Sequence, residues 1–241
     1  TPRDGGTFKI KDTFVQADTV SDSGVPAGPA HPNQAETETT TAISGEDMLR
    51  ANVYGLLARV LTSPPSDETL EIVRDLADAD DSTEMGVALS NLGTLAARTP
   101  RAQVEDEYTR LFYGFGAGGE ITPTASFYRT GFINDKPLAN LRQDLLELGI
   151  TVSGLNKEPE DHIAFLCEVM HGLITGALGA RGREGVGLAK QKSFFQRHLA
   201  PWAARLFGDL EGADAAVFYM PVGTVGKFFM TVEAEAFEMT A

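Results

Sequence analysis

The sequence has little of what disulfide-linked, zinc-binding or membrane-spanning proteins need. Cys167 is its only cysteine in 241 residues, which excludes an internal disulfide and a multi-cysteine zinc or iron–sulfur site. A single thiol fits a reducing compartment. No run of about 18 apolar residues occurs, so no transmembrane helix is expected. Residues 1–10 hold no basic stretch followed by an apolar one, and we predict no signal peptide there.

Basic side chains are also scarce. The chain has 20 lysines and arginines against 34 aspartates and glutamates, which gives a formal net charge of −14. A general nucleic-acid-binding protein needs clustered positive charge for the phosphates, so no nucleic-acid partner is expected. The acidic balance instead favours a cationic partner. Apolar residues make up 42% of the chain, which is typical of a globular protein.

Residues 1–45 differ in composition from the rest of the chain. They are rich in Gly, Pro, Ser and Thr and contain few large apolar side chains. So little apolar surface cannot offset the entropy that is lost on ordering, and we therefore expect a disordered tail. The even spacing of Phe8, Ile10 and Phe14 favours an alternative, a short strand over 7–15.

From residue 44 onward, apolar residues recur at helical spacing. Pro201 is expected to kink or restart one helix, and Pro221 to interrupt the last. No alternating strand pattern follows residue 46, and no repeat of roughly 20–50 residues is visible. We therefore predict a single all-α domain over 46–241. Its helices are predicted to start near residues 44, 66, 82, 100, 135, 159, 188 and 215.

Motifs of common enzymes and metal sites are missing. The chain has neither G-x-S-x-G nor H-E-x-x-H. Cys167 lies among apolar residues of a predicted helix and is interpreted as a buried structural thiol. Glu158 and His162 are four residues apart, but a ferritin-like di-iron site needs the Glu-x-x-His motif twice. We predict no catalytic residue and no metal site.

Two glycine-rich stretches are weak candidates for binding a phosphate. Residues 114–119 follow a predicted helix rather than a strand, and residues 223–227 lead into Phe228 where a phosphate loop has Ser or Thr. We interpret both stretches as helix breaks or places of close helix packing. A nucleotide-binding protein remains a second hypothesis.

Three clusters carry residue types that suit peptide binding. Residues 158–162, E-P-E-D-H, place three carboxylates at a helix start, where they suit the helix dipole or accept a guanidinium. Residues 123–128 combine hydroxyls with two aromatic rings, and residues 198–202 contain the only tryptophan. Each cluster also has a structural interpretation, namely an acidic helix start, a loop on the core, and a core tryptophan beside a kink.

These clusters occur in an order that resembles the TorD/DmsD-type chaperones of molybdenum enzymes, which are related to NarJ. Residues 158–162 are similar to that family's E-P-x-D-H motif, and residues 108–114 to its Y-x-x-L-F-x-G element. Residues 123–150 resemble its central P…S-x-[YW]…L-R…x-G-[IL] stretch, and residues 199–202 its L-x-P-W element. The resemblance covers about residues 46–241, and its motifs are most similar to those of the DmsD branch.

The resemblance implies a function and partners. Such proteins are cytoplasmic, are not enzymes, and bind the twin-arginine signal peptide of a molybdoenzyme subunit until the cofactor has been inserted. The implied partners are this peptide, the catalytic subunit and the Tat translocase. No cofactor is implied, although some members bind GTP weakly, and both monomers and dimers occur. An assembly factor for a non-exported molybdoenzyme, as in the NarJ branch, is the alternative.

A twin-arginine signal has a basic end and an apolar segment, so its complement is an aromatic groove with a carboxylate rim. Asp161 is expected to receive the positive charge of the peptide. His162 is expected to orient that carboxylate or to cap a loop. The residues predicted to bind the peptide are Glu158, Asp161, His162, Pro123, Ser126, Phe127, Tyr128 and Trp202.

Overall fold

A computed structural model describes residues 43–114, 118–152, 158–178 and 186–239. Most of the predicted tail, up to residue 42, lies outside these ranges. The described helices are α1 (Gly45–Thr62), α2 (Asp67–Asp75), α3 (Glu84–Arg98), α4 (Arg101–Tyr108), α5 (Ala125–Thr130), α6 (Lys136–Glu147), α7 (Ile163–Thr175), α8 (Leu188–His198), α9 (Ala203–Glu211) and α10 (Tyr219–Met239). A 3₁₀ turn, η1 (Leu76–Asp78), extends α2, and a π-helical segment, η2 (Thr109–Tyr113), extends α4.

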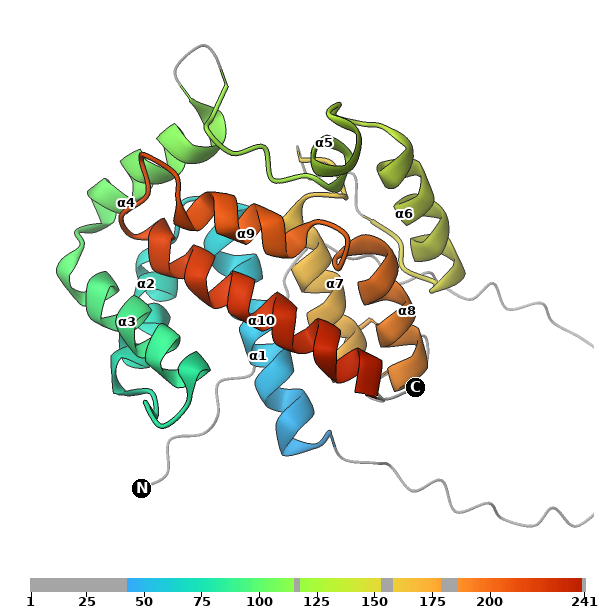
Figure 1. The fold of residues 1–241 in the computed structure, drawn as a ribbon, viewed down its shortest axis with the longest axis horizontal. Coiled ribbons are helices and arrows are strands. Elements are labelled where there is room, and N and C mark those ends of the chain that lie inside the picture. The colour runs from blue at the N-terminus through green and yellow to red at the C-terminus, as the bar shows by residue number, and fades with distance from the viewer. Residues whose placement is uncertain (1–42, 115–117, 153–157, 179–185, 240–241) are drawn as a thin grey trace, which may run out of the picture.

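Two helix pairs form the middle of the fold (Figure 1). The first pair is α1 with α7, and the second is α9 with α10. At one end lie α2, α3 and α4, and at the other lie α5, α6 and α8. The long helix α10 runs between the two ends and also packs on α3. None of the described helices is both long and apolar enough to cross a membrane. The all-α prediction is confirmed for the described residues.

Several helix boundaries follow the capping signals that the sequence predicts. Ser44 precedes α1, and its hydroxyl accepts a hydrogen bond from the N–H of Asp47 at 3.0 Å. Asp135 caps α6, with Pro137 in the first turn. The chain leaves helical geometry between α8 and α9, where Pro201 is expected to restart the helix. Cys167 is fully buried on α7, as predicted.

The start of the last helix differs from the prediction. The helix begins at Tyr219 rather than near residue 215, and Pro221 does not interrupt it. Proline is tolerated there because N–H groups in the first turn have no partner within the helix. The N–H groups of residues 217–219 are accepted instead by the buried carboxylate of Glu107, at 2.7 to 3.0 Å. This contact from α4 fixes the start of α10.

A short helix, α5, begins at Ala125 and so takes in residues 125–128 of the stretch 123–128, whose structural interpretation was a loop on the core. Thr124 caps it, because the Thr124 hydroxyl accepts a hydrogen bond from the N–H of Phe127 at 3.4 Å. Gly131 ends the helix in the left-handed conformation, with φ of 80°. The interpretation of residues 125–128 as a loop was therefore wrong. The sequence did not indicate this helix because six residues are too few to show apolar periodicity.

Two glycines of α10 allow a close approach to α9. A Cβ atom at Gly223 would lie 2.7 Å from the backbone oxygen of Phe207, and one at Gly226 would overlap the Phe207 ring. Only glycine fits at these two positions without a shift of α9. This packing supports the structural interpretation of residues 223–227. In the other glycine-rich stretch, residues 115–117 lie outside the described residues.

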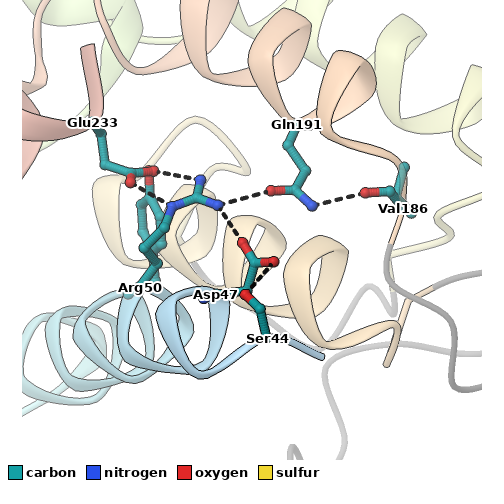
Figure 2. Close-up of polar contacts among 7 residues, drawn as sticks. Ser44, Asp47, Arg50, Val186, Gln191 and Glu233 are labelled. Atoms are coloured by element: carbon teal, nitrogen blue, oxygen red, sulfur yellow. Dashed lines mark hydrogen bonds and ion pairs between the residues drawn. The ribbon is translucent and has the colours of Figure 1, made fainter. Parts of the chain in front are cut away.

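A partly buried ionic network joins α1, α8 and α10 (Figure 2). The guanidinium of Arg50 donates to both carboxylate oxygens of Glu233, at 2.6 and 2.9 Å, and to Asp47 at 2.8 Å. The hydroxyl of Tyr54 donates to the same Glu233 carboxylate at 2.9 Å. Gln191 of α8 accepts a longer bond from Arg50, at 3.4 Å. Burial alone would lower the pKa of Arg50, but Glu233 raises it above its usual value.

Replacing Arg50 with Met should lower the free energy of unfolding by about 3–5 kcal/mol, because Glu233 would remain buried without its main donor. Replacing Arg50 and Glu233 together with Met should destabilise by less than the sum of the single changes. Urea unfolding followed by circular dichroism measures both effects. The control is Arg101→Met, which removes an exposed ion pair with Asp67 and should change stability by less than about 1 kcal/mol. Additive losses for the buried pair would contradict the coupling.

Candidate functional site

Two of the predicted clusters, residues 123–128 and 158–162, lie side by side. An antiparallel β-bridge and two flanking backbone hydrogen bonds of 2.9 Å connect them. The connected pairs are Thr124 with His162, Ala125 with Asp161, and Pro123 with Ile163. The start of α5 is thereby attached to the start of α7. The sequence pointed to both clusters but not to this contact between them.

The carboxylate of Asp161 holds the first turn of α5. Asp161 is fully buried, and its Oδ2 accepts a hydrogen bond from the N–H of Ser126 at 2.7 Å. Backbone donors in a first helical turn have no partner within the helix, so a carboxylate is well suited to accept from them. The Oδ1 atom has no hydrogen-bond partner among the described residues. The predicted place of Asp161 on an exposed rim is therefore wrong, because its charge faces the backbone of α5.

His162 caps α7. Its Nδ1 accepts a hydrogen bond from the N–H of Ala164 at 3.2 Å, and burial lowers the pKa of His162 to about 4. The ring is therefore neutral at pH 7 with its proton on Nε2. The structure thus gives His162 a capping role rather than one in orienting Asp161. In the described part of the chain, it joins no group of three or more His, Cys, Asp or Glu residues that could hold a metal ion.

Trp202 and Ser126 support α5 from within the core. Trp202 is 2% exposed, its ring centroid lies 5.4 Å from that of Tyr128, and its Nε1 donates to the carbonyl of His198 at 2.6 Å. The hydroxyl of the fully buried Ser126 accepts a hydrogen bond from the N–H of Asp135 at 3.2 Å. Both side chains therefore fix α5 rather than face solvent. The third predicted cluster is brought to α5 by the contact between Trp202 and Tyr128.

A cleft of about 770 Å³ lies between residues 120–122, α5 and α9. Phe127, which is 42% exposed, and Tyr128 form what we call the aromatic wall. The Tyr128 hydroxyl donates to Asp209 at 3.0 Å, and the Arg205 guanidinium carbon lies 5.6 Å from the centroid of the Tyr128 ring. Burial and the bond to Asp209 raise the pKa of Tyr128, so the phenol stays protonated at neutral pH.

Charged side chains of both signs line the cleft. Arg129 donates to a backbone carbonyl in the last turn of α8 at 3.3 Å, and Arg205 lies 4.0 Å from Asp209. Glu120 and Asp214, which we call the acidic edge, are exposed and make no ion pair with any residue that the structure describes, although Glu120 accepts a long hydrogen bond from the N–H of Ala215 at 3.4 Å. The acidic edge therefore keeps negative charge that a cationic ligand can use.

The cleft contains only two of the predicted residues. Phe127 and Tyr128 line it, and Glu158 is exposed outside it. The other predicted residues are buried, and these are Pro123, Ser126, Asp161, His162 and Trp202. The sequence analysis missed the charged residues of the cleft, which are Glu120, Arg129, Arg205, Asp209 and Asp214. Isolated charged residues are the usual surface of a helical protein, so nothing in their local pattern distinguishes them.

Comparisons with known proteins agree with the fold. Residues 78–208 match the family model described as nitrate reductase delta subunit. The chain is 30% identical to the chaperone protein TorD of Photobacterium profundum, over 70% of this chain and 85% of that relative. It is 25% identical to TorD of Vibrio atlanticus, over 77% of this chain and 93% of the relative. A structure described as a redox enzyme maturation protein from Archaeoglobus fulgidus has a TM-score of 0.51 at 16% identity, covering 76% of this chain and 94% of that chain.

Replacing Asp161 with Ala should lower the free energy of unfolding by about 2–3 kcal/mol, because the Ser126 N–H would be left buried without an acceptor. Amide hydrogen exchange should also speed up in α5 more than in α7. The control is Asp106→Ala, which removes an exposed ion pair with Arg110 and should cost less than about 1 kcal/mol. Equal effects of the two substitutions would show that Asp161 does not hold α5.

Acid should destabilise the fold through His162. Its folded pKa of about 4 lies below the usual 6.5, so the stability from the neutral ring is complete above pH 6.5 and is lost as the pH falls toward 4. This loss is roughly 3 kcal/mol. The variant His162→Asn keeps a capping acceptor without titrating, so its urea stability should fall less between pH 7.5 and pH 4.5. His198, whose pKa is also lowered by burial, is the same in both proteins. Identical pH profiles would contradict the assignment to His162.

Proposed function

The chain belongs to the nitrate reductase delta subunit family as a TorD-type chaperone, and we propose that it matures a molybdoenzyme by binding the signal peptide of the catalytic subunit. The family is one of chaperones rather than enzymes. The observation that carries the peptide-binding proposal is the cleft beside α5, with its aromatic wall and acidic edge.

The cleft offers what a peptide with a basic end and an apolar segment needs. Carboxylates of the acidic edge can accept a guanidinium in a bidentate pair. The aromatic wall offers apolar area, and its burial contributes about 25 cal/mol per Å² before the losses of association are subtracted. Charge complementarity mainly increases the association rate and sets the orientation of the peptide. The net charge of −14 attracts the same basic end from a distance.

In this proposal the buried motif residues act through α5. Asp161 and His162 fix the starts of α5 and α7, and Ser126 and Trp202 support α5 from inside. They set the position of the aromatic wall without touching the peptide. A wall that is already fixed loses less conformational entropy when a peptide binds.

The expected location and the timing of export follow from the kind of peptide that is bound. A chaperone that covers a twin-arginine signal would act in the cytoplasm and would delay export until the cofactor has been inserted. The Tat translocase would then be a further partner. Assignment to the DmsD branch, weak GTP binding and dimer formation stay predictions from the resemblance.

Calorimetry with the twin-arginine signal peptide of a molybdoenzyme catalytic subunit from the same organism tests the proposal. We expect Tyr128→Ala to weaken binding about tenfold, because an aromatic anchor would be lost. Glu120→Gln with Asp214→Asn should weaken it severalfold and reduce its salt dependence.

The control for these variants is Glu71→Gln with Asp75→Asn on α2, where both residues are exposed and the change in net charge is the same. No heat of binding by the intact protein would reject the proposal. Binding that resists both cleft variants would place the peptide elsewhere on the surface.

The matched family is described as nitrate reductase delta subunit, which keeps one alternative, an assembly factor for a molybdoenzyme that is not exported. A peptide in which the paired arginines are replaced by lysines separates the two functions. A signal-peptide chaperone should bind it about tenfold more weakly, since lysine cannot form the bidentate pair. An assembly factor should instead prefer the terminus of a subunit that carries no export signal.

A further inference from the structure

Residues 3–15 combine apolar side chains with three basic and two acidic ones, Asp4 and Asp12, so the segment has a net charge of +1 in a chain of net charge −14. Their three basic side chains, Arg3, Lys9 and Lys11, are the only Lys or Arg residues before Arg50. The apolar side chains that accompany them are Phe8, Ile10, Phe14 and Val15. Positive charge beside apolar side chains is the composition that the acidic edge and the aromatic wall complement.

We propose that residues 3–15 occupy the cleft when no client peptide is bound. If the segment is extended, Phe8 and Ile10 point to one side and Lys9 and Lys11 to the other. Asp12 and Phe14 follow Phe8 and Ile10 on the same side, so the apolar contact with the aromatic wall comes from Phe8 and Ile10. Lys9 and Lys11 fit the acidic edge. Occupation of the cleft depends only on this complementarity. If the segment occupies the cleft, it competes with a client peptide for the same place. This competition rests on the proposed function, whereas the occupation does not.

The rest of the N-terminal chain is long enough for this contact. Residues 16–42 can span at most about 90 Å, whereas a domain of this size has a radius of gyration of roughly 16 Å. The same stretch contains four acidic residues and no lysine or arginine, so it does not compete for the acidic edge. A tethered segment reaches effective concentrations in the millimolar range, so a contact that is weak between separate molecules can still be populated.

A spin label on the full-length chain tests the contact. The only native thiol, Cys167, is fully buried, so a nitroxide reagent should react selectively with the thiol introduced by Thr13→Cys. The label should broaden the amide signals of Gly131 and Gly208, which line the cleft, and leave that of Gly93 on α3 unchanged. No broadening at the cleft, or equal broadening at all three glycines, would overturn the proposal.

Charge variants show whether the contact is specific. Lys9→Gln with Lys11→Gln should reduce the broadening at the cleft at least twofold. Ala27→Glu with Ala30→Glu, which changes the net charge equally within the connecting stretch, should leave it unchanged. Broadening in an isotope-labelled chain mixed with separate spin-labelled chains would indicate contact between copies and would overturn the internal one.

Titration with the client peptide tests the competition. The variant Lys9→Gln with Lys11→Gln should bind the peptide about 5- to 10-fold more tightly than the unaltered chain, because the competing segment is weakened. Equal affinities would overturn the competition. If the label reports occupation of the cleft and no client peptide binds, the proposed function fails and the occupation stands. If the peptide binds and the label reports no occupation, the inference fails alone.

Discussion

The hydrogen bond from the N–H of Ser126 to the buried carboxylate of Asp161, together with the backbone bridge between residues 123–125 and 161–163, fixes the start of α5. A helix of six residues is not stable alone, so its position must come from its contacts. The aromatic wall and the bond from Tyr128 to Asp209 both depend on that position. A buried charge is expensive unless a donor faces it, and the first turn of α5 presents one such donor, the N–H of Ser126. The carboxylate and the helix start therefore stabilise each other.

The other residues of the same motif extend this attachment to neighbouring helices. Glu160 accepts two hydrogen bonds from Arg142 of α6, at 3.1 and 2.7 Å. Burial opposes ionisation of Glu160, but the bonds from Arg142 hold its pKa below the usual value. Two residues after Glu160, His162 caps α7. Five residues thus connect α5, α6 and α7, so a short acidic sequence has a structural explanation that does not need a ligand.

The fold was more predictable from the sequence than the site. Apolar periodicity and capping residues such as Ser44 and Asp135 act within one or two turns, so they are visible in a single sequence. The short helix α5 and the start of α10 depend on contacts with Asp161 and Glu107, which come from distant parts of the chain. The residue type of Asp161 suggested that it binds a positive charge. Only the packing shows whether its carboxylate faces solvent or backbone.

Both sides of the cleft are fixed by contacts that lie outside it. On one side Asp161 fixes α5, and on the other Gly223 and Gly226 allow α10 to hold α9 closely. The groups that face the cleft have little to do with stability, because most of them are exposed. Under the proposed function, a change in the buried set is therefore expected to alter stability and peptide affinity together, whereas a change in Phe127 is expected to alter affinity alone. This separation gives a physical criterion for telling residues that position the site from residues that touch its ligand.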